Sequence, residues 1–324
     1  MSRNYRFDNI KFILITLVVF GHFLELIDGQ AADNLYRVIY LFHISAFIFI
    51  TGYFAKFNPS KILFSFIVPY VLLQILYLVF HSFVISEKST VTLQITKPYW
   101  LLWYLMAVAF YYLLIPFFET RNKRKEIMII AAVVAVSLLA GFDENIGYFL
   151  SLSRFFTFLP FFLTGYYLGQ NNNLEKKTDT NISSHILLSM AVLGVIISIF
   201  YVVNSPIRYQ VLYGSYSYEA MNYGPGIKLL LTAFAFFWII LLLHMIPNKK
   251  IMGISIIGKN TLPVYVLHGF LVKLADKYDL FIYSEINNLL LALILTFVIL
   301  FFFGNKYVAI LFQLRLSATH KKRS

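Results

Sequence analysis

The sequence predicts an all-α, polytopic membrane protein of about ten transmembrane helices. Of its 324 residues, 60% are hydrophobic and only 13% are charged, and the mean hydropathy is +0.74, whereas soluble domains are about 25% charged. Apolar runs of about 20 residues, the length that crosses the hydrocarbon core, recur along the chain. The polar segments between them are short, so we expect residues 1–324 to form a single transmembrane domain.

Ten apolar runs set the expected order of the helices. We place them at about 10–28, 37–55, 62–85, 100–118, 126–142, 148–169, 185–203, 227–246, 255–274 and 286–312, each near the length of a membrane span. A signal peptide is the alternative for the first run, because small residues follow it at Gly29 and Ala31. His22 and Glu25 do not suit the apolar core of a signal peptide, so we interpret this run as a retained helix.

Basic residues are distributed unevenly between the loops on the two sides of the membrane. With the N-terminus inside, most Lys and Arg fall in inner segments, among them Arg121–Lys125, Lys249–Lys250 and Lys321–Arg323. An excess of Lys and Arg is typical of cytoplasmic loops. We therefore expect a multi-pass protein of the cell membrane with both termini in the cytoplasm.

The remaining composition excludes several classes of protein. The net charge is +12, but the basic residues form small clusters between apolar runs, so no nucleic-acid partner is predicted. Cysteine is absent, which excludes disulfides, thiolate metal sites and an acyl-cysteine intermediate. No zinc-type histidine motif, Gly-rich phosphate loop or Gly-x-Ser-x-Gly elbow occurs, so we expect no metal and no serine hydrolase chemistry.

The first predicted helix carries the most informative ionisable residues. Lys11 and His22 are eleven residues apart, which on a helix returns to within about 20° of the same face, about 16.5 Å further along the axis. The thioester of an acyl-CoA whose phosphates are bound near Lys11 would then reach His22. We hypothesise that Arg6 and Lys11 hold the phosphates of an acyl-CoA and that His22 is a general base for a sugar hydroxyl. Glu25, at i+3, would orient the imidazole.

A structural interpretation of the same residues stays open. Lys11 would then be an interfacial lysine with its ammonium in the headgroups, and His22 would be a packing residue bonded to a carbonyl.

The opening segment Tyr5–His22 (YRFDNIKFILITLVVFGH) resembles the first helix of the acyltransferase 3 family. That family carries a basic residue, usually Arg, then ten residues and a histidine; this chain has Lys11 in the basic position, which lacks the bidentate geometry of Arg. The FDNIK form is similar to the fucose 4-O-acetylase-like branch, whose members O-acetylate bacterial surface polysaccharides.

Further segments resemble the family in the expected order. His43, before FIFITGYF, matches its second histidine, with packing against the Gly52–Tyr53 turn as the alternative. Trp103 lies in WLLWYL, which is similar to a tryptophan motif of the fourth helix; paired aromatics there are also ordinary interfacial anchors. Arg154 opens RFFTFLPFFLTGYYLG, and His268 closes GKNTLPVYVLH.

The buried Arg154 calls for an anionic partner, for which Glu25, Asp143 and a ligand phosphate are the candidates. The tyrosine-rich loop 204–226 is typical of a carbohydrate-facing surface and equally of interfacial tyrosines.

The resemblance implies a membrane-bound O-acyltransferase of the bacterial cell membrane. It would move an acetyl group from acetyl-CoA to a hydroxyl of a cell-surface or capsular polysaccharide, or of its lipid-linked precursor. His22, Glu25 and His43 would be catalytic, Arg6 and Lys11 would bind the donor, and Arg154, His268 and Trp103 would stabilise charge or bind substrate. A transporter or flippase of lipid-linked glycans is the alternative, because buried His, Arg and Glu also line substrate and proton paths. A nonenzymatic membrane scaffold is the third reading.

Overall fold

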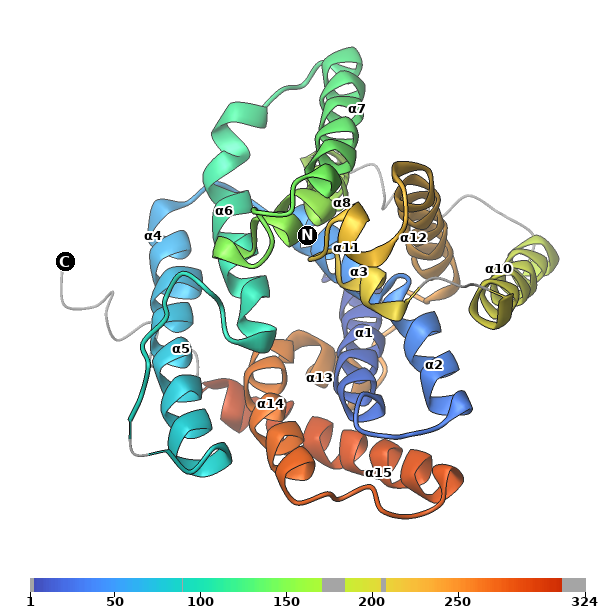
Figure 1. Ribbon diagram of the computed structural model, residues 1–324. Coiled ribbons are helices and arrows are strands. Elements are labelled where there is room, and N and C mark those ends of the chain that lie inside the picture. The colour runs from blue at the N-terminus through green and yellow to red at the C-terminus, as the bar shows by residue number, and fades with distance from the viewer. Residues whose placement is uncertain (1–2, 89, 171–183, 205–207, 311–324) are drawn as a thin grey trace. The chain divides into compact units, whose positions relative to one another are not determined.

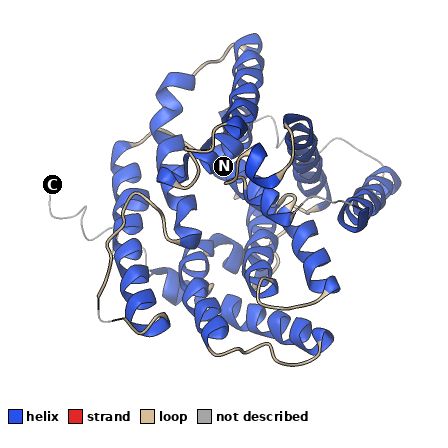
Figure 2. Ribbon diagram, viewed as in Figure 1, coloured by secondary structure: helices blue, strands red, loops and turns tan. Residues whose placement is uncertain are grey.

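The computed structural model describes residues 3–88, 90–170, 184–204 and 208–310. Within these ranges every regular element is a helix and no strand is present, as Figure 2 shows. Helices occupy all ten predicted positions, so the predicted all-α class is confirmed. Seven of the described helices are long and apolar enough to cross a membrane. The count of about ten crossings stays a prediction.

The chain forms two compact units. The first comprises Met1–Ile44, Ala191–Val203 and Ile240–Ser324, as far as these residues are described, and the second comprises Ser45–Met190 and Asn204–Ile239. Three helices, α3 (His43–Tyr53), α10 (Ser184–Asn204) and α12 (Pro225–Met245), contribute residues to both units. Lys321–Arg323, part of the predicted inner charge, lie outside the described residues.

The first unit is built around its N-terminal helix. In Figure 1, α1 (dark blue) is flanked by helices from the C-terminal part of the chain, and it contacts α2, α13, α14 and α15. The elements are α1 (Tyr5–Leu24), α2 (Gln30–Tyr40), the start of α3 (His43–Tyr53), part of α10 (Ser184–Asn204), the end of α12 (Pro225–Met245), α13 (Ile254–Lys259), α14 (Thr261–Lys277) and α15 (Glu285–Phe303).

Helix α1 begins five residues earlier than the predicted span. Asn4 is the N-cap, and its side-chain oxygen accepts a hydrogen bond from the Arg6 N–H at 3.1 Å, which satisfies a first-turn amide. Asp8 in the first turn also suits the positive end of the helix. Lys11 and His22 therefore lie on one uninterrupted helix.

Two predicted helices are interrupted. The 37–55 span divides between Tyr40 and His43, and the His43 imidazole bonds the Ile39 carbonyl at 2.8 Å. The 255–274 span divides at Asn260. Pro263 then falls in the first turn of α14, where its missing N–H costs no hydrogen bond.

The second unit holds the tryptophan and arginine motifs. Its helices α7 and α8 pack together, as do α6 and α8. The elements are α4 (Pro59–Ile62), the π-helices η1 (Leu63–Ile67) and η2 (His81–Ile85), α5 (Val68–Phe80), η3 (Trp100–Leu102), α6 (Trp103–Phe118), α7 (Lys123–Leu139), η4 (Ala140–Phe142), η5 (Phe149–Ser151), α8 (Leu152–Gln170), η6 (Tyr209–Tyr213) and α11 (Tyr218–Met221), with the remaining parts of α3, α10 and α12.

Glycine permits one close helix contact in this unit. A Cβ on Gly165 or Gly169 of α8 would collide with the backbone oxygen of Phe49 or Tyr53 on α3. Small residues at such i,i+4 positions let two membrane helices approach closely.

Candidate active site

His22 lies in the last turn of α1 and pairs with the residue that ends the helix. Its Nδ1 is 3.3 Å from Glu25 Oε1, and the two side chains are 15% and 25% exposed. Glu25 is the C-cap and keeps helical backbone angles, which brings its carboxylate back over the preceding turn. The i+3 spacing therefore forms a His–Glu pair largely enclosed by the protein.

Two tyrosines of α2 complete the surroundings of this carboxylate. Tyr36 and Tyr40 donate their hydroxyl protons to Glu25 Oε1 at 2.9 and 2.8 Å. The Tyr40 hydroxyl also lies 3.2 Å from His22 Nδ1. Since its single proton goes to Glu25, the Tyr40 oxygen accepts from Nδ1–H. This assignment gives His22 a protonated Nδ1 and a basic lone pair on Nε2.

His268 on α14 lies against His22. The two rings stack with centroids 5.4 Å apart and planes inclined by 21°. His268 is fully buried, and its Nδ1–H donates to the Val264 carbonyl at 3.0 Å. Among the described residues, no hydrogen-bond partner is found for its buried Nε2. In its neutral form, His268 therefore keeps an acceptor lone pair on an Nε2 atom that the protein encloses.

His43 joins the same group through Tyr40. It is 1% exposed, its ring lies 4.6 Å from the Tyr40 ring, and its Nδ1–H is given to the Ile39 carbonyl. The sequence candidates His22, Glu25, His43 and His268 therefore form one cluster in the first unit.

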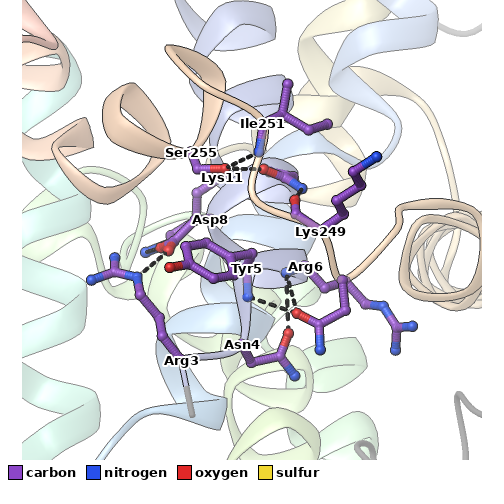
Figure 3. Close-up of polar contacts among 11 residues, drawn as sticks. Arg3, Asn4, Tyr5, Arg6, Asp8, Lys11, Lys249, Ile251 and Ser255 are labelled. Carbon is purple, nitrogen blue, oxygen red and sulfur yellow. Dashed lines mark hydrogen bonds and ion pairs between the residues drawn. The ribbon is translucent and has the colours of Figure 1, made fainter.

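The N-terminal end of α1 carries the other candidates, Arg6 and Lys11. Figure 3 shows this end, where Lys11 Nζ pairs with Asp8 at 3.1 Å and Arg3 Nε bonds the same carboxylate at 2.7 Å. The hydrogen bond with Asp8 raises the pKa of Arg3 above its usual value. Arg6 donates from Nε to the Ile246 carbonyl at 3.0 Å. The Lys11 side chain is 22% exposed.

The loop that precedes α13 is hydrogen-bonded to the N-terminal end of α1. Asn9, which is 2% exposed, donates to the carbonyls of Pro247 and Lys249 at 3.1 and 2.9 Å. Its oxygen accepts from the Ser255 hydroxyl at 2.8 Å. In Figure 3 the Lys249 side chain extends away from Asp8. Arg3, Arg6, Lys11 and Lys249 thus lie near the N-terminal end of α1 (Figure 3).

Trp103 and Arg154 lie together in the second unit. The Arg154 guanidinium is 5.0 Å from the Trp103 ring and 5.3 Å from the Tyr148 ring, distances at which a cation is attracted to an aromatic face. Its Nε donates to the Tyr213 carbonyl at 3.3 Å. Asp143, one predicted partner, accepts from the Asn145 N–H. The tyrosine-rich loop therefore contributes directly to the surroundings of Arg154.

Sequence reasoning missed three residues of the first unit. Asp8 pairs with Lys11, and Tyr36 and Tyr40 bind Glu25. Local signals existed for all three, because Asp8 precedes Lys11 by three residues and the tyrosines are four apart on one helical face. Nothing in the sequence shows that this face meets the end of α1. Among the described residues, no group of three or more His, Asp or Glu side chains converges as a metal ion requires.

A sequence model of an acyltransferase domain, that of the acyltransferase 3 family, matches residues 4–304. The chain belongs to this family. It is also similar to the nodulation protein NolL of Sinorhizobium fredii (strain NBRC 101917 / NGR234), with 42% identity over 60 residues. That stretch covers 17% of this chain and 16% of NolL, so the match spans only a small part of this relative. No solved structure matches the chain significantly.

Proposed function

We propose that this acyltransferase is an O-acetyltransferase that uses acetyl-CoA to acetylate a hydroxyl of a cell-surface or capsular polysaccharide, or of its lipid-linked precursor. The observation that carries the proposal is the His22–Glu25 pair on the first helix of a member of the acyltransferase 3 family. A carboxylate that accepts from Nδ1–H makes Nε2 of the imidazole a general base, as acyl transfer to a hydroxyl needs.

The reaction follows from that base. His22 Nε2 takes the proton of the acceptor hydroxyl while the hydroxyl oxygen attacks the carbonyl carbon of the acetyl thioester. The tetrahedral intermediate collapses as its C–S bond breaks, and the imidazolium returns the proton to the departing CoA sulfur. Glu25 stabilises the imidazolium between these steps. The products are an acetyl ester and CoA.

The donor would enter from the N-terminal end of α1. Arg6 and Lys11 supply positive charge there for the CoA phosphates. The helix rise between Lys11 and His22, about 16.5 Å, is comparable to the reach of the pantetheine arm. Because Lys11 is already paired with Asp8, phosphate binding would compete with this ion pair.

The remaining candidates would serve the acceptor and the developing charge. His268 Nε2, a buried atom with no partner found among the described residues, would accept a hydrogen bond from a hydroxyl. His43 would add a second imidazole near Tyr40. Arg154 would stabilise negative charge on the intermediate. Trp103, whose ring contacts Arg154 and Phe158, would help to bind the substrate.

The acceptor class and location rest on sequence features. The FDNIK form supports the fucose 4-O-acetylase-like branch and thus a bacterial surface glycan. The excess of Lys and Arg in alternate loops supports a cell-membrane protein with both termini in the cytoplasm.

The decisive experiment uses purified protein in liposomes with acetyl-CoA labelled in the acetyl group and a glycan extract of the source cell. We expect label to enter the glycan as an alkali-labile ester, and NMR of the product to identify the sugar and the hydroxyl. Glycan movement across the liposome membrane without acetyl-CoA, and without transfer of label, would instead establish the transporter.

A further inference from the structure

Two tyrosine hydroxyl groups of helix α2 bond to one carboxylate oxygen of Glu25. Tyr36 and Tyr40 are four residues apart and so share a face of the helix. Their rings stack with centroids 3.9 Å apart and planes inclined by 26°. Both hydroxyls donate to Glu25 Oε1, at 2.9 and 2.8 Å, and this oxygen also lies 3.3 Å from His22 Nδ1. Three donors therefore converge on a single oxygen.

The placement of α2 is fixed at both ends. At its N-terminus, the Glu285 carboxylate of α15 accepts from the backbone N–H groups of Ala31 and Ala32 at 2.7 and 3.0 Å, which caps the helix. Near its C-terminus the Tyr40 ring packs on Gly21, where a Cβ would lie 3.1 Å from Tyr40 Cε2. The hydroxyls are therefore held by packing that does not depend on Glu25.

Glu25 lies at the end of a helix, where the local backbone does little to restrict the rotamers of its side chain. It is the C-cap of α1, and its carboxylate is partly exposed. A glutamate side chain in such a position has several rotamers, and each fixed donor removes some of that freedom. Hydrogen bonds to an ionised acceptor are also about twice as strong as neutral ones.

We propose that Tyr40, assisted by Tyr36, is a positioning residue that holds the Glu25 carboxylate against His22 Nδ1–H and thereby keeps His22 as an Nε2 base. This inference rests on the proposed function and adds to it the residues that select the tautomer. Tyr40 has the larger role because its oxygen also lies 3.2 Å from Nδ1. Tyr36 contributes through its hydrogen bond to the Glu25 carboxylate.

The kinetic test compares Tyr40→Phe, Tyr36→Phe and Glu25→Gln, with Tyr278→Phe as the matched control because Tyr278 is 68% exposed. We expect Tyr40→Phe to lower kcat roughly tenfold to hundredfold, Tyr36→Phe to lower it less, and the KM for acetyl-CoA to stay unchanged. In a Glu25→Gln background, Tyr40→Phe should lower kcat by a smaller factor than in the wild-type protein, because part of the tyrosine's effect passes through Glu25. An undiminished kcat in Tyr40→Phe, or independent effects of the two substitutions, overturns the inference.

A second measurement does not depend on turnover. Diethyl pyrocarbonate modifies neutral imidazoles, and mass spectrometry gives its rate at His22 relative to His244 in the same molecule. We expect Tyr40→Phe and Glu25→Gln to lower this ratio to a similar extent, about threefold or more. Each substitution removes a hydrogen-bond partner that keeps the proton of the neutral imidazole on Nδ1 and leaves the lone pair on Nε2. An unchanged ratio in Tyr40→Phe overturns the inference. If wild-type protein transfers no acetyl group, the proposed function fails while the labelling ratio still decides the inference.

Discussion

His22 and His268 stack with ring centroids 5.4 Å apart, although they come from opposite ends of the chain. The stack joins α1 to α14, and the Val264 carbonyl fixes the His268 tautomer. Two positive charges at this distance would repel each other. In the proposed mechanism, His22 would therefore act as the base while His268 would accept a hydrogen bond.

Replacement of His22 is the most direct test of the proposed base. We expect His22→Ala to lower the rate of labelled acetyl transfer by about 10²-fold to 10⁴-fold, because general-base assistance is lost. His244→Ala is the control, since the structure places His244 near the end of α12 with Nδ1 bonded to the Ile240 carbonyl. Wild-type transfer by the His22→Ala protein would refute the mechanism.

The Nε2 atom of His268 can be tested with two amide substitutions. His268→Asn keeps a donor near the Nδ1 position but removes Nε2, whereas His268→Gln places a polar atom nearer Nε2. We expect transfer to fall roughly tenfold to hundredfold in His268→Asn and less in His268→Gln, because a buried hydrogen bond to substrate is lost. Equal rates in both variants would show that His268 serves packing alone.

Lys11 should govern the affinity for the donor. We expect Lys11→Ala to raise the KM for acetyl-CoA about tenfold with little change in kcat, because a phosphate contact is lost in ground and transition state alike. Lys11→Arg keeps the charge and should stay near wild type. Lys306→Ala, at the far end of the described chain, is the matched control. If the KM of Lys11→Ala is as low as that of the control, Lys11 does not bind the donor.

Asn9 should contribute to stability rather than chemistry. It makes three hydrogen bonds, to the carbonyls of Pro247 and Lys249 and with Ser255. We expect Asn9→Ala to lower the free energy of unfolding by about 1–3 kcal/mol, because the buried Asn9 side chain and its three hydrogen bonds are lost. Thermal unfolding in detergent measures the change, and exposed Asn145→Ala is the control. A midpoint equal to that of the control would contradict the expectation.

The close packing of α3 and α8 predicts a strong effect at Gly165. A methyl group there would collide with the Phe49 carbonyl, so Gly165→Ala should destabilise the protein by about 1–3 kcal/mol. Gly224→Ala provides the comparison, because no described atom lies within 4 Å of a Cβ at that position. Unfolding midpoints that move equally in both variants would argue against the crossing.

Much of the fold followed from local sequence. Apolar runs separated by charged or Gly- and Pro-containing segments predicted a helix at each of ten positions, because burial in lipid demands continuous apolar surface and internal hydrogen bonding. The pairing of His22 with Glu25 also followed, since residues three apart on a helix are neighbours. The break before His43 did not follow, because the apolar run continues across it and hydropathy does not record a local change in backbone angles.

The sequence by itself determined the helical membrane class, the family resemblance and the positions of most candidate residues, because spacing within one helix fixes which side chains share a face. Only the tertiary structure decided that His268 stacks on His22 and that Tyr36 and Tyr40 bind Glu25. The stack and the tyrosine contacts depend on how helices pack against one another, and packing is a property of complementary surfaces that periodicity does not record.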